Sequence, residues 1–518
     1  MRTRSGNGHL RYDFRSQALP ILLLLVVGFL CLWNLSHYPL PWFDEGLNFQ
    51  PPRNLVLHGQ YAMLSSEGFR VLDPALQTGP PVTLPIAFSF RVLGIGLFQA
   101  RLVTSLFSIL CVVIYYHIAQ SLYGRAVGWL AAILLLTFAA DDFVSFLYLG
   151  RQVLGEIPAL FFFLSGLLMW FRSWERVKGH YLAGAGLLFG LAMVTKSQFT
   201  LLVPPTLLVV WLIGFFIFRT LRWRHLILPA MLCVGLVLIW YGLQTVIVGP
   251  QQSFLDLETL RAGVRLHVLS CSLATIRHSL GVLVRTGYVV WGGLGLAYAF
   301  WCSRQRTLTA LRRLALLAFV GLWLLWYTVA SIGWARYAFV AVAVSHIFYA
   351  ALLCDALAAL APLRRTGTRR HQLRIAFALA LLLITGWMIA SGYSVIRSVL
   401  GNRDESYFLF ARYLDETIPP SAIVESWEWE LDLITDLRYH HPPTSVTNAV
   451  THRLWVDGSE DKTVYDFRQF EPDYLIVGRF ARWTELYPPD FLEHKCALVK
   501  SIGDYDLYRV NVNAKKSK

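Results

Sequence analysis

The chain has 518 residues, of which 56% are hydrophobic and only 15% are charged, a balance that excludes a soluble protein of this size and indicates a membrane protein. Its net charge of +14 does not indicate nucleic-acid binding, because the charge is divided unevenly along the chain. Residues 400–518 hold 20 of the 32 acidic residues and are net acidic, whereas the basic residues of the preceding 399 cluster between apolar runs, as topology signals do.

Eleven apolar segments are predicted to span the membrane. The first is expected to be retained as a span, because no small-residue cleavage site follows it as in a signal peptide. In chain order the predicted spans are 18–36, 98–121, 126–142, 154–172, 181–194, 198–218, 226–248, 284–302, 314–331, 335–357 and 373–397.

Segment 80–96 is apolar, but it contains Pro85 and Arg91 and is shorter than the roughly 20 residues that a span requires. If it does not span, every basic cluster between the later spans faces the cytoplasm, whereas a twelfth span would move these clusters outside. We therefore expect an interfacial helix on the outer leaflet. The chain is then a multi-pass protein of the cytoplasmic membrane, with a cytoplasmic N-terminus and an extracytoplasmic C-terminal tail.

Two domains are expected: a transmembrane domain over 1–399, whose first outer loop is 37–97, and a small extracytoplasmic α/β domain over 400–518. Alternating helical and strand patterns indicate the second domain. We expect helices at 404–416 and 430–439, strands at 422–426 and 474–478, and a final hairpin that turns at Gly503 and Asp504.

The strongest local signal is the sequence PWFDEG, in which Asp44 and Glu45 follow the end of the first span among aromatic residues. The plain interpretation is a solvated acid pair beside an interfacial aromatic anchor. The functional interpretation is a partly desolvated carboxylate, which has the raised proton affinity that a general base needs.

A third acid, Glu156, begins a predicted span in the sequence GRQVLGEIPALFFF. It either complements the helix dipole or faces the same site as Asp44. The nearby Arg151 either binds a phosphate through two hydrogen bonds or reaches to the membrane interface as an anchor.

Three further residues lie at the outer ends of spans: Lys196 in MVTKSQ, and Arg336 with Tyr337 in GWARYAF. The positive-inside bias does not account for cations at this side. Either they bind an anionic ligand at the outer face, with the Tyr337 hydroxyl beside Arg336, or they anchor the chain to lipid phosphates.

The sequence contains no Walker loop, no GxGxxG and no GxSxG elbow with partners, which argues against nucleotide-driven chemistry. A transferase on the outer side of a membrane needs a donor that is delivered through the lipid. A polyprenyl-phosphate sugar is such a donor, because cations can stabilise its phosphate as the leaving group. The acceptor hydroxyl is a poor nucleophile and needs a carboxylate base.

Several segments together resemble the GT-C superfamily of integral-membrane glycosyltransferases. The likeness is greatest to bacterial members of glycosyltransferase family 39, which includes protein O-mannosyltransferases and the lipid A aminoarabinose transferase. The segments that carry this resemblance cover much of the chain, namely WFDEG with PPRNLVLHGQYA (51–62), TGPPVTLP (78–85), FQARLVTSLF (98–107), GEIPALFFF (155–163), GLAMVTKS (190–197) and ARYAF (335–339).

The resemblance implies that Asp44 is the catalytic base, that Glu45 lies beside it in the site and that Glu156 is the second acidic position. It also implies that a donor-phosphate region is lined by Arg53, Lys196, Arg336 and Tyr337. One departure is Gly79, which stands where many relatives have a lysine before the Pro-Pro pair, so that contact is absent or comes from Arg151 or Arg53. The tail resembles the extracytoplasmic domain appended to many such enzymes, where it helps to bind the acceptor.

The predicted activity is therefore an inverting sugar transfer from a polyprenyl-phosphate donor to a lipid, glycan or protein hydroxyl at the outer face of the membrane. A flippase or transporter for a lipid-linked saccharide and a noncatalytic envelope-assembly protein are the alternatives. The sequence leaves open the sugar, a Mg²⁺ or Mn²⁺ ion between Asp44 and Glu156, and a disulfide between Cys271 and Cys496.

Overall fold

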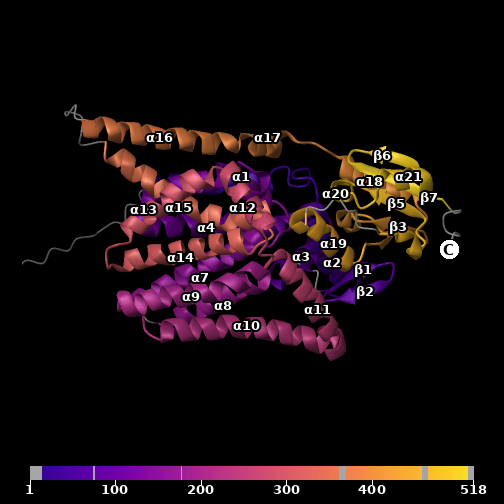
Figure 1. Ribbon diagram of the computed structural model, residues 1–518, viewed down its shortest axis with the longest axis horizontal. Coiled ribbons are helices and arrows are strands. Elements are labelled where there is room, and N and C mark those ends of the chain that lie inside the picture. Colours follow the sequence, from indigo (N-terminus) through magenta and orange to yellow (C-terminus); the bar gives the residue numbers. More distant parts are fainter. Residues whose placement is uncertain are drawn as a thin grey trace, which may run out of the picture.

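The computed structural model describes residues 14–73, 76, 78–176, 178–360, 369–457 and 465–511. Most of the chain forms an elongated bundle of helices, and a smaller sheet-containing domain built from the C-terminal residues caps one end of it (Figure 1). The first outer loop, with helices α2 and α3 and the hairpin β1–β2, lies between the bundle and this C-terminal domain.

The helices of the bundle follow the apolar runs of the sequence, because a helix satisfies all of its backbone hydrogen bonds within itself where no water is present. In chain order they are α1 (Phe14–Leu32), α4 (Leu97–Tyr123), α5 (Arg125–Thr137), α6 (Phe146–Gly150), α7 (Glu156–Glu175), α8 (Gly179–Thr195), α9 (Ser197–Leu212), α10 (Arg224–Val248), α11 (Pro250–His267), α12 (Leu273–Arg285), α13 (Tyr288–Cys302), α14 (Leu308–Val329), α15 (Ala335–Ala358), α16 (Arg369–Ser391) and α17 (Tyr393–Gly401).

Within the described residues, seven helical stretches are long and apolar enough to cross a membrane, so the chain is a multi-pass membrane protein. The pair α12–α13, bent by 82°, forms an eighth candidate span. Shorter apolar helices in α1, α5 and α8 account for the rest of the eleven predicted segments, so the predicted helical architecture is confirmed while the number of spans stays approximate.

Helix α15 forms the centre of the bundle, since 89% of its apolar window is buried, compared with 11% for α10 at the periphery.

Close packing connects α10 to α8, where Gly186 and Gly190 lie four residues apart. A Cβ at Gly186 would lie 2.8 Å from the Cβ of Leu232 and 2.9 Å from the Cα of Pro229. Small residues at this spacing let two membrane helices approach closely.

The first outer loop is more structured than its sequence suggests. It contains α2 (Phe43–His58), an antiparallel hairpin of β1 (Ala62–Ser65) and β2 (Gly68–Val71), and α3 (Pro80–Leu93). With 14 residues, α3 is shorter than the roughly 20 that a span needs. Its position on the outer leaflet remains a prediction.

The C-terminal domain contains a five-stranded sheet in the order β4-β3-β5-β7-β6. The strands β3 (Ile423–Ser426), β4 (Arg438–His440) and β5 (Tyr474–Val477) are parallel, and β7 (Tyr505–Val510) and β6 (Cys496–Ile502) complete it as an antiparallel hairpin. The connecting helices are α18 (Ser406–Thr417), α19 (Thr444–His452), α20 (Arg479–Thr484) and α21 (Pro489–Lys495). The expected small α/β domain is therefore present.

The helix predicted at 430–439 is wrong. These residues form a short 3₁₀ helix, η4 (Trp429–Leu433), followed by strand β4. Strand β4 pairs in parallel with β3, and Leu431 and Leu433 are buried in the core that the C-terminal domain shares with α2 and α3. Tertiary contacts thus override the local helical pattern at these positions.

Candidate functional site

Asp44 is the second residue of α2, and its carboxylate pairs with Arg336, the second residue of the central helix α15. The Asp44 Oδ2 atom accepts a hydrogen bond from Nη1 of Arg336 at 2.6 Å and one from Nε1 of Trp42 at 3.3 Å. The side chain of Asp44 is 12% exposed and that of Arg336 is 5% exposed. The buried central helix α15 therefore holds Arg336 in place, and Arg336 in turn pairs with Asp44, the principal candidate base.

A second ion pair lies beside the first. Glu156, the first residue of α7, has its Oε1 atom 3.0 Å from Nζ of Lys196, which joins α8 to α9. Nε of Arg336 lies 3.9 Å from the same oxygen. Four residues that are far apart in the sequence thus meet in one charged cluster: Asp44, Arg336, Glu156 and Lys196.

The charged cluster contains two carboxylates and two cations in almost dry surroundings. Burying charges costs several kcal/mol per ion, on the order of the whole stability of many domains, and pairing offsets only part of that cost. Both carboxylate oxygens of Glu156 lack a well-aligned hydrogen bond among the described residues, even though Lys196 lies within ion-pair distance. Buried ionisable groups at the end of a helix bundle are expensive, and they therefore indicate a functional site.

A cavity of about 770 Å³ adjoins the charged cluster, between the bundle and the C-terminal domain. Lys196, Tyr337 and Phe43 line its wall on the side of the cluster. The peripheral helices α10 and α11 contribute Trp240, Val248 and Leu257, and the C-terminal domain contributes Trp429, His440 and His441. The cavity therefore joins apolar walls on the helices of the bundle to a wall on the C-terminal domain that carries two histidines.

The surroundings of Gly79 explain why no lysine stands at this position, where the family resemblance leads us to expect one. A Cβ there would lie 1.9 Å from the carbonyl oxygen of Val194, and the Gly79 amide donates a hydrogen bond to the carbonyl of Thr195 at 3.1 Å. No side chain fits this contact between the start of α3 and the end of α8. The neighbouring Lys196 supplies a cation to the same cavity wall instead.

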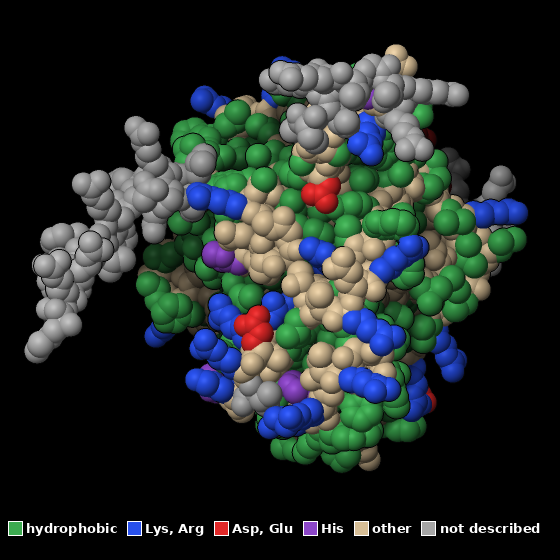
Figure 2. Space-filling model, turned by 90° about the vertical axis from the view of Figure 1, so that its left-hand side faces the viewer, with side chains coloured by type: hydrophobic (Ala, Val, Ile, Leu, Met, Phe, Trp, Pro, Cys, Tyr) green, Lys and Arg blue, Asp and Glu red, His purple; other side chains and the backbone are tan. Residues whose placement is uncertain are grey.

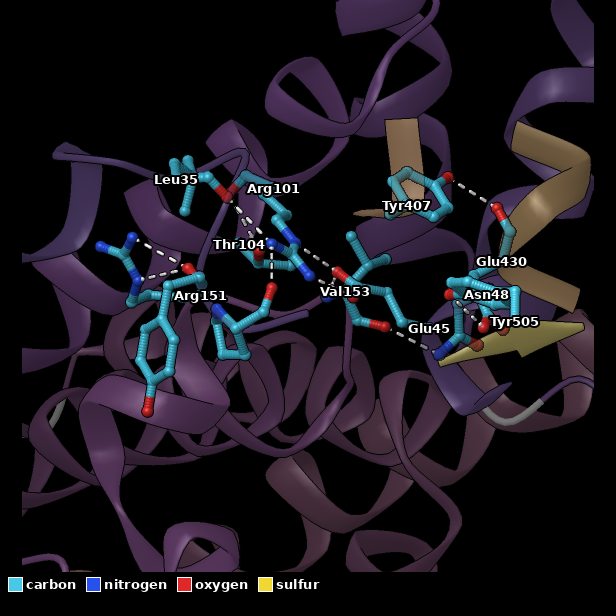
Figure 3. A network of polar contacts seen from close by, with 12 residues as sticks. Leu35, Glu45, Asn48, Arg101, Thr104, Arg151, Val153, Tyr407, Glu430 and Tyr505 are labelled. Carbon is cyan, nitrogen blue, oxygen red and sulfur yellow. Dashed lines mark hydrogen bonds and ion pairs between the residues drawn. The ribbon is translucent and has the colours of Figure 1, made fainter. Parts of the chain in front are cut away.

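Glu45, expected beside Asp44 in the site, instead has a structural environment (Figure 3). Its two carboxylate oxygens accept hydrogen bonds of 2.7 and 2.6 Å from the guanidinium of Arg101, and the backbone amide of Val153 donates another at 3.0 Å. Arg101 also donates to the carbonyls of Leu35 and Pro39. Glu45 and Arg101 are fully buried, so this pair joins α2 to α4 rather than facing the cavity.

Arg151 does not contact the charged cluster either. Its guanidinium donates to the backbone carbonyls of Leu30, Trp33 and Tyr38 at distances between 2.5 and 3.0 Å, and the side chain is fully buried. Figure 3 shows it beside the Arg101 network rather than in the cavity. These hydrogen bonds stabilise the C-terminal end of α1 and the residues that follow it. The phosphate contact proposed for Arg151 from the sequence finds no support.

Arg53 lies near the other end of α2, at the junction with the C-terminal domain. Its guanidinium donates to the carbonyl of Thr435 at 3.0 Å and lies 3.4 Å from the carboxylate of Asp436. It is absent from the cavity wall. The donor-phosphate contact expected for Arg53 likewise finds no support in this arrangement.

A divalent metal between Asp44 and Glu156 does not fit these residues. The guanidinium of Arg336 bridges the two carboxylates, and Lys196 adds a second cation. Among the described residues, no group of three or more His, Cys, Asp and Glu side chains is arranged to hold a metal ion. Cys271 and Cys496 are also separate, since Cys271 is exposed and Cys496 is buried, both as free thiols.

Sequence reasoning missed Arg101 as the partner of Glu45. The signal was present, because a single arginine within the apolar run 98–121 needs a compensating anion inside a membrane domain. The sequence pattern alone could not decide whether Glu45 or Glu156 is the anion that pairs with Arg101.

Comparisons with known proteins agree with this architecture. A family model described as dolichyl-phosphate-mannose-protein mannosyltransferase matches residues 78–241. No curated protein sequence matches the chain.

Among solved structures, the chain is similar to ArnT from Cupriavidus metallidurans bound to undecaprenyl phosphate, with a TM-score of 0.63 and 14% identity, over 95% of this chain and 98% of that one. The apo form of the same protein gives a TM-score of 0.61 at 14% identity, over 97% and 100% of the two chains. The oligosaccharyltransferase AglB from Archaeoglobus fulgidus, in complex with an inhibitory peptide and a dolichol-phosphate, gives 0.57 at 12% identity, over 96% and 75%. The predicted resemblance to the GT-C superfamily is confirmed, and the chain has the GT-C fold.

Proposed function

We propose that this chain is a membrane glycosyltransferase that transfers a sugar from a polyprenyl-phosphate donor to an acceptor hydroxyl at the outer face of the cytoplasmic membrane. The observation that carries the proposal is the buried cluster of Asp44, Arg336, Glu156 and Lys196 beside a cavity of about 770 Å³. One side chain of this set can accept a proton while two others stabilise a phosphate, which are the two tasks that the reaction requires.

The cavity suits a lipid-linked donor. Its wall includes side chains of α10, whose apolar window is only 11% buried, the lowest share among the candidate spans of the described residues, so a polyprenyl chain can leave the cavity along this exposed helix into the bilayer. On the side of the charged cluster, Lys196 lines the cavity and can form a charge-assisted hydrogen bond to a phosphate. The ArnT structure contains undecaprenyl phosphate and the AglB structure contains a dolichol-phosphate, which supports a polyprenyl-phosphate substrate for this fold.

We infer the following reaction from these positions. Asp44 takes the proton of the acceptor hydroxyl, and the hydroxyl oxygen forms a bond to the anomeric carbon from the side opposite the phosphate. The bond between the anomeric carbon and the phosphate oxygen breaks, and its electron pair stays on the phosphate. Lys196 and Arg336 stabilise the negative charge that develops there, and the configuration at the anomeric carbon inverts.

The orientation is supported by the distribution of basic residues. Figure 2 shows the end of the bundle opposite the C-terminal domain, where Lys and Arg side chains are numerous and acidic ones are few. The helix ends and loops there carry the exposed Arg172, Arg176, Arg219, Arg222 and Arg304. The positive-inside rule assigns such an end to the cytoplasm, and the C-terminal domain and the charged cluster to the outside.

Transport of a lipid-linked saccharide is the second candidate, and the 82° break between α12 and α13 favours it, since transporters use interrupted helices. The charged cluster, however, lies on α2, α7 and α15 and at the junction of α8 with α9, and none of its residues belongs to α12 or α13. A transferase accounts for both the cluster and the cavity.

The test compares the purified wild-type protein with Asp44→Asn, using undecaprenyl-phosphate hexoses and pentoses as donors. The wild type should release sugar-free undecaprenyl phosphate from at least one donor, and Asp44→Asn should lower the rate by about 10²–10⁴-fold, the usual contribution of a general base. Elution should be unchanged in the variant, and a cooperative thermal transition should show that it remains folded. Full turnover by Asp44→Asn would remove Asp44 from the mechanism, and accumulation of flipped but intact donor would favour transport.

A further inference from the structure

Four polar atoms in the cavity wall lack a hydrogen-bond partner among the described residues. They are Oγ1 of Thr78, Oε1 of Gln198, Nδ1 of His267 and Nε1 of Trp334. All four atoms are buried, and the side chains of Thr78 and Gln198 belong to residues that are only 1% and 3% exposed. The four residues come from four different segments of the chain, and all four line one cavity.

These atoms carry a cost. A buried donor or acceptor without a partner costs about 1–3 kcal/mol, and native proteins keep few of them without a reason. Nearby hydroxyls in helices of the bundle are satisfied: Thr195 donates to the carbonyl of Leu191, and Thr206 donates to that of Leu202. Other buried atoms without a partner lie elsewhere among the described residues, but Thr78, Gln198, His267 and Trp334 are the ones that also line the cavity.

The four groups border the charged cluster. A Cβ at Gly155, the residue before Glu156, would lie 3.3 Å from the Thr78 hydroxyl. Gln198 follows Lys196 by two residues, and Trp334 precedes Arg336 by two, with the Arg336 guanidinium carbon 5.0 Å from the centre of its ring. The ring of His267 lies 5.2 Å from that of Trp334.

The chemistry of the groups is that of uncharged hydrogen bonding. The threonine hydroxyl donates and accepts, the glutamine amide offers both roles, and the indole nitrogen donates. Burial, opposed by a hydrogen bond of the ring with Asn448 and aided by the nearby Arg336, lowers the pKa of His267 to about 4, so its ring is neutral at neutral pH and its Nδ1 atom adds no charge. Such a set complements hydroxyl groups rather than a phosphate.

We propose that Thr78, Gln198, His267 and Trp334 form the subsite that binds the hydroxyl groups of the donor's sugar ring. This inference rests on the proposed function, and it separates recognition of the sugar from recognition of the phosphate by Lys196 and Arg336. The ligand class is a neutral, polyhydroxylated pyranose or furanose ring. These four residues then determine which lipid-linked sugar the enzyme accepts.

The test uses Thr78→Val, Gln198→Leu and Trp334→Phe, each of which removes the polar atom and keeps most of the side-chain shape. Two quantities are measured in detergent: kcat/KM for the best undecaprenyl-phosphate sugar, and the Kd for sugar-free undecaprenyl phosphate. Each variant should lower kcat/KM by about 5- to 100-fold, as expected for a lost hydrogen bond in a dry site, while the Kd changes by less than about 3-fold.

Thr206→Val and Trp170→Phe serve as matched controls, since both donors already have backbone partners and neither residue lines the cavity. They should leave both quantities unchanged. Wild-type kcat/KM in the three subsite variants would overturn the assignment, as would an equal loss of affinity for the sugar-free lipid. If the wild type turns over no lipid-linked sugar, the proposed function fails, and the subsite fails with it.

Discussion

At the scale of single residues, the charged cluster alternates signs so that each charge has an opposite neighbour. Arg336 contacts Asp44 and approaches Glu156, and Glu156 also contacts Lys196. A phosphate that binds Lys196 and Arg336 would compete with the two carboxylates for these cations. Asp44 would then lose part of the stabilisation of its ionised form and become a stronger base at the moment when the donor is bound.

Lys196→Met should therefore weaken the binding of undecaprenyl phosphate by about 10- to 100-fold, which corresponds to one charge-assisted hydrogen bond. The measurement is a binding titration in detergent, with Lys178→Met as the control because Lys178 is exposed at the opposite end of the bundle. Equal affinity in the wild type and Lys196→Met would show that the phosphate binds elsewhere.

Glu45 and Asp44 are neighbours in sequence, but we predict that removing the charge of Glu45 mainly lowers stability, whereas removing that of Asp44 mainly lowers turnover. Glu45→Gln leaves Arg101 as a buried charge without its bidentate partner, which should cost about 3–5 kcal/mol of stability. Thermal unfolding in detergent should show a large loss for Glu45→Gln and a smaller one for Asp44→Asn, because Glu156 remains 3.9 Å from Arg336 when Asp44 is neutralised. Replacing both members, as Glu45→Met with Arg101→Met, should recover part of that loss. A stable Glu45→Gln protein without turnover would instead assign Glu45 to the chemistry.

At the scale of elements, α2 carries Asp44 and is held by the C-terminal domain. The amide of Gln50 donates to Asp432, and Arg53 donates to the carbonyl of Thr435. Gly46 lies against the backbone of η4, where a Cβ would be 2.3 Å from the amide nitrogen of Glu430. The C-terminal domain thus fixes the helix that presents the candidate base.

Gly46→Ala should force α2 and η4 apart, at a cost of about 1–3 kcal/mol from overpacking against backbone that cannot give way. We expect both a lower unfolding temperature and slower sugar transfer, since Asp44 is two residues away. Gly235→Ala is the matched control, because a Cβ at Gly235 meets nothing within 4 Å. Wild-type stability and turnover in Gly46→Ala would contradict the clamping of α2.

The sequence could not predict α2 as a helix, because Pro51 and Pro52 interrupt any helical pattern. The structure accommodates them within a helix that is buried from Phe43 to Asn54. The η4–β4 segment was missed for a related reason, since its pairing with β3 lies outside any local window. By contrast, long apolar runs report spans directly, and all eleven predicted segments overlap helices.

At the scale of the whole molecule, sequence reasoning selected charged residues at the ends of predicted spans. Asp44, Glu156, Lys196 and Arg336 were selected separately, and the structure brings them together. Arg53 was selected only from the family resemblance and Arg151 from its place near Glu156, and both donate to backbone carbonyls. One-dimensional patterns cannot distinguish these outcomes, because the partner of a buried arginine depends on chain segments that pass nearby in space.

Two native cysteines test the orientation of the chain. Cys271 is exposed between α11 and α12 at the predicted outer side, and Cys302 ends α13 at the predicted cytoplasmic side. A membrane-impermeant maleimide should label Cys271 in right-side-out vesicles and Cys302 only in inside-out vesicles. Cys271→Ser should abolish the outside signal. The reverse labelling pattern would place the C-terminal domain in the cytoplasm.

The most direct measurement is a cryo-EM structure of the chain in nanodiscs with undecaprenyl phosphate added. The phosphate should lie within hydrogen-bond distance of Lys196 and Arg336 in the cavity, with the polyprenyl chain leaving past α10 and the Asp44 carboxylate open toward the sugar position. A phosphate bound among the basic loops at the opposite end of the bundle would contradict the account.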